Sequence, residues 1–313
     1  MSVVVLGSIN IDLVVQVPRL PGRGETAIGN RFFKAAGGKG ANQAVAVAQL
    51  GTPVELVAQV GNDQFGGWLL EQLRAAQVGT EAVRVNRSIH TGVATIVVEA
   101  SGDNAIACAA GANNCVNEED IAQFEKLLRQ VPAGQQSVAL LELGVPLTAV
   151  VEAAQVAHRY GSYVILDPAP ACRELPNELY ESVDLITPNE VEATQLVGFP
   201  VDGPATAAQA AQVLHQRGVT HVMITLGSQG AYCSLPHEAF VVPALAVEVV
   251  DTVAAGDAFN GGLAAALVSG QSVREAVKWG TVAGALAVTK SGAQSSLPDW
   301  QSFQTLLSAS NTQ

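Results

Sequence analysis

The sequence predicts an α/β fold in which a mainly parallel sheet is covered by helices on both faces. Short apolar runs alternate with helical patterns of about 10–15 residues, which is the order that parallel strands and crossover helices produce. Hydrophobic residues make up 49% of the 313 residues and charged residues only 14%, as expected for strands buried on both faces. We therefore expect one α/β domain over residues 1–313.

The apolar runs and helical patterns give the expected elements in order. Strands are expected at Val3–Leu6, Val54–Val60, Ser137–Leu143, Tyr163–Asp167, Leu185–Thr187 and His221–Thr225. Helices are expected at Ala41–Leu50, 63–76, Glu118–Arg129, Leu147–Tyr160, Glu190–Val197 and Ala205–Arg217. Three short strands (Gly230–Leu235, Phe240–Val242 and Val247–Val250) and two Ala-rich helices (Ala255–Val268 and Val273–Thr289) complete the chain.

Two stretches, about 12–35 and 92–110, interrupt this rhythm. Both alternate apolar and polar residues and lack a helical period, and the second has a turn at Ser101-Gly102-Asp103-Asn104. They are either two unrelated surface hairpins or the antiparallel strands of one small sheet. A small sheet over the α/β body would form a lid that excludes water from a reaction.

Charge and cysteine content exclude several classes of protein. The net charge is −12 without a basic run, which argues against a nucleic-acid partner. The four cysteines have neither disulfide-framework nor zinc-site spacing. Because no basic leader precedes the first strand and no apolar run approaches about 18 residues, we expect a cytoplasmic protein without membrane spans.

The run Asp251-Thr252-Val253-Ala254-Ala255-Gly256-Asp257 is the strongest chemical feature. Its small residues precede a helix, so the backbone N–H groups of Ala254, Ala255 and Gly256 would form an anion hole for a phosphoryl group. Asp257 would lie in the first helical turn and accept a proton from an attacking hydroxyl. The helix dipole is expected to lower its pKa. The alternative is an ordinary helix cap.

A glycine-rich turn, Gly37-Gly38-Lys39-Gly40-Ala41-Asn42-Gln43, opens an earlier helix. It lacks the GxxxxGK[ST] spacing of a P-loop and also the GxGxxG spacing. Close backbone approach at the glycines and the amide of Asn42 suit a neutral polyhydroxylated ligand.

Polar residues also end several strands, where ligands bind in open α/β sheets. Asn10 and Asp12 follow the first strand and share one face if the chain stays extended; they are otherwise turn-forming residues. Glu142 ends another strand, where an isolated carboxylate is usually solvated.

Two further turns could meet a nucleotide. Asn189 and Glu192, in Thr187-Pro188-Asn189-Glu190-Val191-Glu192, either hold Mg²⁺ and its waters or form a capping box. The turn Thr225-Leu226-Gly227-Ser228-Gln229-Gly230 closes a strand and offers N–H groups to phosphates, although many hairpins have this composition.

Taken in order, these pieces resemble the ribokinase branch of the PfkB carbohydrate kinase family. The resemblance extends from GSINID at Gly7–Asp12 to GAQSSLP at Gly292–Pro298. It includes AGGKGANQA at Ala36–Ala44, AGAN beginning at Ala110, DPAPA at Asp167–Ala171, TPNE, TLGSQG and DTVAAGDAFNG.

The resemblance implies a ribokinase-like fold with a β-sheet lid, a homodimer contact through that lid, and transfer of the ATP γ-phosphoryl group to the 5-hydroxyl of ribose. It implies Asp257 as the base and Ala254, Ala255 and Gly256 as the anion hole. Sugar contacts implied by it are Asn10, Asp12, Gly38, Lys39, Gly40, Asn42, Glu142 and Asp257. Nucleotide contacts are Asn189, Thr225, Leu226, Gly227, Ser228, Gln229, Gly230, Gly256 and Thr281.

The resemblance also implies two cations. K⁺ would bind beside the anion hole, mostly through backbone carbonyls, at Asp251, Val253, Ala287, Lys290, Gly292 and Ser296. Mg²⁺ would be associated with Asn189 and Glu192. The sequence departs from the family pattern at Ala258, where many members have Thr, and at Asp167, where ribokinases often have Asn.

Alternative functions remain at this point. A related kinase could act on deoxyribose, another sugar or a nucleoside, although aromatic residues for stacking a base are only 5% of the chain. A non-catalytic sugar-binding protein on the same fold would not need Asp257 and the anion hole. A nicotinamide dehydrogenase would need GxGxxG after the first strand.

Overall fold

Nine strands form the main sheet of the computed structural model, which describes residues 2–99, 103–132 and 134–310. Their order is β13-β12-β11-β10-β9-β8-β1-β4-β5, and the strands from β5 to β11 in this order run parallel. The strands are β1 (Ser2–Leu6), β4 (Val54–Gly61), β5 (Val83–Asn86), β8 (Ser137–Glu142), β9 (Tyr163–Asp167), β10 (Leu185–Ile186), β11 (His221–Thr225), β12 (Ala231–Leu235) and β13 (Glu238–Val242). The predicted mainly parallel sheet is confirmed.

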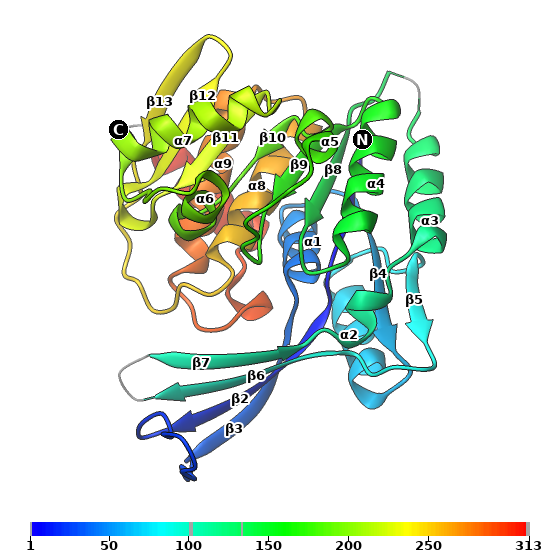
Figure 1. The fold of residues 1–313 in the computed structure, drawn as a ribbon, viewed down its shortest axis with the longest axis vertical. Coiled ribbons are helices and arrows are strands. Elements are labelled where there is room, and N and C mark those ends of the chain that lie inside the picture. Colours follow the sequence, from blue (N-terminus) through cyan, green and yellow to red (C-terminus); the bar gives the residue numbers. More distant parts are fainter. Residues whose placement is uncertain (1, 100–102, 133, 311–313) are drawn as a thin grey trace.

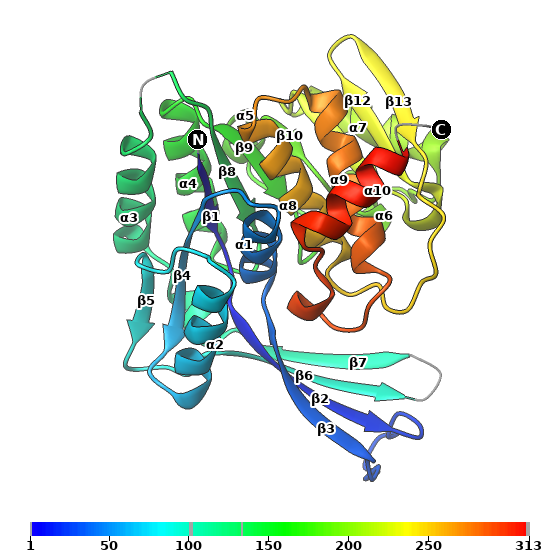
Figure 2. The same ribbon diagram turned by 180° about the vertical axis from the view of Figure 1, so that it is seen from behind.

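Helices cover both faces of this sheet. The helices α3 (Glu118–Arg129), α4 (Leu147–Arg159), α5 (Asn177–Glu181), α6 (Glu190–Val197) and α7 (Pro204–Gln216) lie on the face toward the viewer in Figure 1. The opposite face, toward the viewer in Figure 2, carries α1 (Lys39–Gln49), α8 (Ala255–Val268), α9 (Val273–Ala287) and α10 (Trp300–Ser310). The helix α2 (Gln64–Ala75) lies beside β4, and three short 3₁₀ turns occupy Gly111–Cys115, Gly227–Gln229 and Gln294–Ser296.

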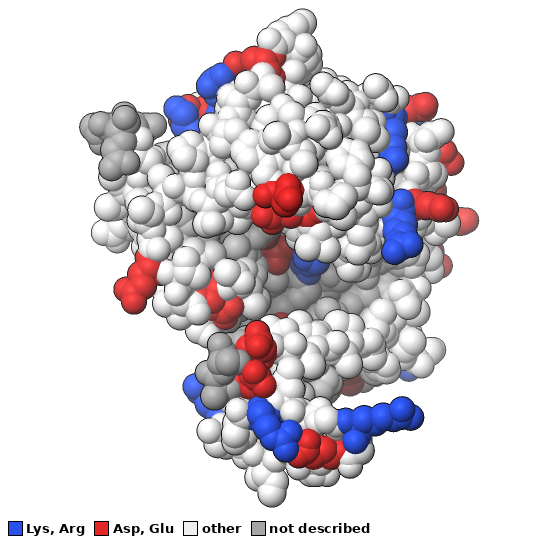
Figure 3. Space-filling model, turned by 60° about the vertical axis from the view of Figure 1, so that its left-hand side comes forward, with Lys and Arg blue, Asp and Glu red and all other residues white. Residues whose placement is uncertain are grey.

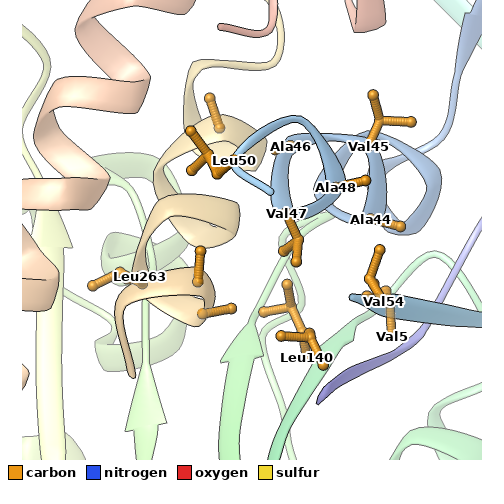
Figure 4. Packing of buried hydrophobic residues seen from close by; sticks show 14 of the residues in the cluster. Val5, Ala44, Val45, Ala46, Val47, Ala48, Leu50, Val54, Leu140 and Leu263 are labelled. Carbon is orange, nitrogen blue, oxygen red and sulfur yellow. The ribbon is translucent and has the colours of Figure 1, made fainter. Parts of the chain in front are cut away.

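Alternate residues of each central strand enter two separate hydrophobic cores. In β1, Val3 and Val5 pack on the α1 and α8 side, whereas Val4 and Leu6 pack on the α3 and α4 side. Figure 4 shows the first core, where the Ala- and Val-rich face of α1 lies against β1, β8 and Leu263 of α8. Small side chains let α1 approach the sheet closely, and this fixes the position of the glycine-rich turn before it.

A second, four-stranded sheet extends from the body beneath the carboxyl ends of the parallel strands (Figure 1). It has the order β3-β2-β6-β7 and contains β2 (Asn10–Val17), β3 (Arg31–Gly37), β6 (Gly92–Glu99) and β7 (Asn104–Ala109). The two stretches that interrupt the α/β rhythm therefore do pair into one sheet. The pairs β2–β3 and β6–β7 are antiparallel as expected, but β2 and β6 run parallel to each other. Ser101 and Gly102 of the expected turn lie outside the described residues.

The structure corrects the expected elements at several places. The predicted strand Val247–Val250 is wrong: the segment lies outside every strand, and Val249 and Val250 are 61% and 58% exposed. Its backbone is anchored instead by the N–H of Val250, which donates to the carbonyl of Val288 at 2.8 Å. The strand β5 and the helices α5 and α10 were not expected, because they are short or carry a weak apolar period.

Candidate active site

A pocket of about 190 Å³ lies where the carboxyl ends of β9, β10 and β11 meet the start of α8. Its lining comprises Lys39, Asp167, Thr187, Asn189, Glu192, Thr225, Thr252, Ala254, Ala255, Gly256, Asp257, Phe259 and Asn260. Figure 3 shows the hollow that separates the body from the small sheet, with acidic side chains along its margin. The run Asp251–Asp257 thus opens into a space shared with residues from four other parts of the chain.

The turn before α8 has the backbone expected of an anion-binding site. Ala254 has a left-handed backbone, with φ of 60°, and α8 begins at the next residue. A positive φ is costly for a non-glycine residue and is found where the surrounding structure enforces it. Gly256 is exposed in the first turn, where backbone N–H groups have no helical partner. These features suit an oxyanion or phosphoryl group at this position.

Asp257 is buried beside this turn and is held by two amides from α1. Its Oδ2 accepts a hydrogen bond from Asn42 Nδ2 at 2.8 Å, and its Oδ1 accepts one from Gln43 Nε2 at 3.1 Å. Burial raises the pKa of Asp257, although Lys39 and the two amides oppose the shift. The expected lowering of this pKa by the helix dipole is therefore wrong, because the carboxylate is only 5% exposed and desolvation dominates. A raised pKa makes Asp257 a better proton acceptor than the sequence suggested.

Lys39 provides positive charge among several carboxylates. Burial alone lowers the pKa of Lys39, but Asp167, Asp257, Glu192 and Glu142 outweigh that effect and raise it. The ammonium group is therefore charged at neutral pH, and Lys39 belongs to the pocket lining.

The glycine-rich turn packs directly on the end of β1. A Cβ atom on Gly38 would lie 2.6 Å from the carbonyl oxygen of Ser8, and Gly38 has φ of 93°. A Cβ atom on Gly40 would lie 2.7 Å from Gly7. Only glycine fits both positions, and their close contact brings Lys39 and Asn42 beside the residues that follow β1.

Glu142 is fully buried, so the expectation of a solvated carboxylate is wrong. It accepts hydrogen bonds from the backbone N–H groups of Ser8 and Gly144. Burial raises its pKa, while these bonds and Lys39 oppose the rise. Its bonds fix the chain between β1 and β2 rather than leaving a free carboxylate in the hollow.

Asn10 and Asp12 lie in the extended strand β2, two residues apart, as the sequence predicts. Asn10 Oδ1 accepts a hydrogen bond from Asn113 Nδ2 at 2.7 Å. Burial, with a smaller contribution from Asp257, raises the pKa of Asp12 to about 6. Asp12 and Asp257 are therefore close enough for their charges to interact.

The two expected nucleotide turns lie side by side. A β-bridge joins Asn189 to Thr225, and both line the pocket. Asn189 Oδ1 accepts from the N–H of Glu192 at 2.9 Å and Glu192 Oε2 accepts from the N–H of Asn189 at 2.8 Å, which is the capping-box alternative. Glu192 itself also lines the pocket.

The turn Gly227–Gln229 is a single 3₁₀ turn between Leu226 and Gly230. Ser228 and Gln229 are exposed, whereas the side chain of Leu226 is buried in the core and offers only backbone to a ligand. Thr281, on α9, donates to the carbonyl of Val277 and is outside the pocket lining.

Asp251 connects the residues expected to hold a monovalent cation. Its Oδ1 accepts from the N–H of Val253 at 3.0 Å and its Oδ2 from the N–H of Gly292 at 2.9 Å. The same region contains Ala287, the last residue of α9, Lys290 and the buried Ser296. The segment after α9 is thus tied to the anion-binding turn.

Several residues in or directly behind the pocket were not assigned a role from the sequence. Asp167, at the end of β9, and Gln43, in α1, are buried and hydrogen-bonded to each other, and Thr187 donates to Asn260 Oδ1 at 2.7 Å. Asp167 was visible only as a departure from a family pattern. The position of Gln43, next to Asn42, gave no signal that its amide reaches the carboxylate of Asp257.

Among the described residues, no group of three or more His, Cys, Asp or Glu side chains is arranged to hold a metal ion. None of the helices in the described part of the chain has the length and apolar character needed to cross a bilayer.

The family model described as "pfkB family carbohydrate kinase" matches residues 1–300. The chain belongs to the PfkB family of carbohydrate kinases. A Haemophilus influenzae ribokinase is 41% identical over 300 residues, covering 96% of both chains. A Salmonella typhi deoxyribokinase is 35% identical over 308 residues, covering 98% of this chain and 99% of its own. The Arabidopsis thaliana ribokinase solved with ribose and ATP has a TM-score of 0.88 at 32% identity, covering 97% of this chain and 98% of its own.

Proposed function

We propose that this chain phosphorylates D-ribose at its 5-hydroxyl, using ATP and giving ribose 5-phosphate and ADP. The observation that carries the proposal is the position of Asp257, which is buried next to the turn at Ala254 and bonded to the glycine-rich turn through Asn42. A carboxylate between a sugar-binding turn and an anion hole is the arrangement that phosphoryl transfer requires. The ribokinases among the similar proteins support ribose as the sugar.

In this reaction Asp257 accepts the proton of the 5-hydroxyl as the hydroxyl oxygen bonds to the γ-phosphorus and the bond to ADP breaks. The N–H groups of Ala254, Ala255 and Gly256 stabilise the charge on the transferring group. We assign the sugar to Asn10, Asp12, Gly38, Lys39, Gly40, Asn42 and Glu142. For Asn10 and Glu142, whose side chains already bond within the protein, the role includes shaping the sugar site.

ATP would lie along Asn189, Thr225–Gly230, Gly256 and Thr281. The polar lining near Asn189 and Glu192 suits Mg²⁺ bound through water and nucleotide oxygens, because no protein-only cluster of ligands is needed there. Mg²⁺ neutralises phosphate charge when it is bound.

The residues near Asp251 suit K⁺. Carbonyl oxygens of Val253, Ala287, Lys290 and Gly292, with Ser296, are the hard oxygen donors that replace the hydration shell of this ion. Asp251 already fixes the anion-binding turn to Gly292, so an ion here would hold the turn in one conformation.

The small sheet, formed by residues about 12–35 and 92–110 of the single domain 1–313, would act as a lid that excludes water from the reaction. Its outer residues Phe32 and Ile106 are 66% and 56% exposed, which suits a homodimer contact through the lid. We expect a cytoplasmic enzyme.

The experiment that tests the proposal is coupled detection of ADP release over a panel of ribose, deoxyribose, fructose and adenosine, with and without K⁺. Ribose should give the highest kcat/KM. Deoxyribose is the second candidate because of the deoxyribokinase relative. Faster turnover of deoxyribose, fructose or adenosine than of ribose would overturn the assignment.

A further inference from the structure

One side-chain amide joins two buried carboxylates in the pocket. Gln43 Nε2 donates to Asp167 Oδ2 at 2.7 Å and to Asp257 Oδ1 at 3.1 Å. The three residues come from α1, β9 and α8, and Gln43 is fully buried while each aspartate is 5% exposed. A single NH₂ group therefore uses both of its hydrogens to hold the two carboxylates at a fixed separation.

The orientation of this amide is set by the carboxylates. Gln43 Oε1 is buried without a hydrogen-bond partner among the described residues. Leaving a buried acceptor unpaired costs free energy, so its occurrence calls for an explanation. If the amide were reversed, Oε1 would face two carboxylates and repel both, which costs more free energy than one unpaired acceptor. The bonds from Nε2 to Asp167 and Asp257 therefore explain why Oε1 is unpaired.

The charges around the two carboxylates are unbalanced. The titratable groups that act on them or on their partner Lys39 come from six elements: Asp12 in β2, Lys39 in α1, Glu142 in β8, Asp167 in β9, Glu192 in α6 and Asp257 in α8. Lys39 is the cation of this set. Burial raises the pKa of Asp167 well above its ordinary value, and the charges of Glu192, Asp257 and Glu142 add to the rise while Lys39 opposes it. Repulsion across the bridging amide is mutual, so a negative charge on either aspartate favours protonation of the other.

We propose that Gln43 is a positioning residue that aims Asp257, and that Asp167, held by the same amide, makes Asp257 a better proton acceptor. The inference rests on the proposed phosphorylation, in which Asp257 takes the proton of the sugar hydroxyl. Neither Gln43 nor Asp167 needs to touch the sugar for this role.

Two variants separate the two parts of the proposal. Asp167→Asn keeps an oxygen that accepts from Gln43 and removes the charge, so Asp257 should lose its proton more easily. Gln43→Met keeps the length and burial of the side chain but removes the donor, so Asp257 should hold its proton more tightly. The acidic limb of the profile of kcat against pH should therefore move to lower pH in Asp167→Asn and to higher pH in Gln43→Met. Each shift should be at least about 0.5 pH unit.

The measurement is kcat against pH at saturating ribose and ATP, where the bound sugar already engages Asp12. Gln43→Met should also lower kcat by about tenfold while the dissociation constant for ribose changes less than about threefold. If kcat and the affinity for ribose fell by the same factor, Gln43 would have a merely structural role.

Gln59→Met is the matched control. Gln59 is also fully buried, and its Nε2 donates to Asp120 Oδ2 at 2.7 Å and to the carbonyl of Cys115 at 2.6 Å, away from the pocket. This variant should keep the wild-type acidic limb even if it unfolds at a lower temperature.

The outcomes distinguish this inference from the proposed function. A wild-type chain that does not phosphorylate ribose overturns the proposed function. A wild-type chain that does, with an acidic limb that stays in place in Asp167→Asn, overturns the role of Asp167. If Gln43→Met does not fold, Gln43→Asn, which is too short to reach both carboxylates, takes its place, and an unmoved limb there overturns the role of Gln43.

Discussion

Asn42 Nδ2 donates a hydrogen bond of 2.8 Å to Asp257 Oδ2, joining residues that are 215 positions apart. The bond links the first turn of α1 to the first turn of α8. Because both helices pack on the same face of the sheet, the glycine-rich turn and the anion-binding turn are held in one rigid arrangement. The base of the proposed reaction is therefore aimed before any ligand binds.

Replacing Asp257 by Asn should remove the proton acceptor without changing the shape of the site. An amide at this position still accepts from Asn42 or Gln43, so the dissociation constant for ribose, measured by calorimetry, should stay within about threefold of wild type. The value of kcat for ADP release should fall by roughly 10²–10⁴.

The matched control is Asp120→Asn, which also replaces a fully buried, hydrogen-bonded aspartate. Its kcat should equal that of the wild type. Near-normal turnover in Asp257→Asn would remove Asp257 from the role of base.

Gly40→Ala should destabilise the protein because its Cβ would lie 2.7 Å from the backbone of Gly7 and 2.8 Å from the nitrogen of Ser8. Backbone atoms move less easily than side chains, so we expect a loss of roughly 1–3 kcal/mol in the free energy of unfolding. Denaturation with urea measures this loss.

The control for this change is Gly67→Ala in α2, where an added Cβ has no atom within 4 Å. That variant should be neutral or gain up to about 1 kcal/mol, since alanine is the better helix former. Equal stability of the two variants would contradict the close approach at Gly40.

Most of the helices and strands could be predicted because their hydrophobic patterns lie within each segment of the sequence. The helix Ala255–Val268 was predicted with the bounds that the structure has, because its apolar residues face a core along their whole length. The failure at Val247–Val250 has the opposite cause. Three β-branched valines around Glu248 read as a strand, but this segment lies outside every strand of the described chain, and Val249 and Val250 remain exposed.

The sequence predicted the parts of the candidate site whose backbone conformation is set by a local motif. It did not predict the pKa values of carboxylates that are buried by distant parts of the chain. The turn at Ala254 and the extended strand carrying Asn10 and Asp12 follow from small residues and alternation. The burial of Asp257 and Glu142, which raises both pKa values, depends on helices and strands far away in the sequence. No local pattern carries that information.

The raised pKa of Asp12, about 6, gives opposite effects of pH on stability and on sugar binding. The folded state binds a proton here more tightly than the unfolded state, so this group's contribution to stability falls as pH rises from about 4 to about 6. Asp12→Asn should remove that loss, leaving the variant about 1–2 kcal/mol more stable than wild type above pH 6, after allowance for the partial exposure of the group.

Sugar binding should change in the other direction. An ionised Asp12 accepts hydrogen bonds from sugar hydroxyls better than a protonated one, so the affinity of the wild type for ribose should rise as pH rises through about 6. In Asp12→Asn it should be weaker and nearly independent of pH. Calorimetry at pH 5, 6 and 7.5 measures it, and an equal pH response in both proteins would rule out Asp12 as the cause.

Asp251 should make the enzyme respond to K⁺, because its carboxylate ties Val253 and Gly292 together at the proposed cation site. In the wild type, K⁺ should raise the melting temperature without any substrate and should increase kcat, whereas a bulky organic cation should do neither. Asp251→Ala releases both N–H groups, so half-maximal activation should require at least about tenfold more K⁺. The rise in melting temperature should disappear with it.

Asp299→Ala is the control for Asp251→Ala, since Asp299 also accepts a backbone N–H, from Ser302 at 2.8 Å, but at the start of α10. It should lower the melting temperature by a constant amount while the K⁺ response stays that of the wild type. Because the melting temperature is measured without ribose or ATP, this response is independent of the reaction. A wild-type protein indifferent to K⁺ in both measurements would show that the carbonyls around Val253 and Gly292 serve only to hold the turn.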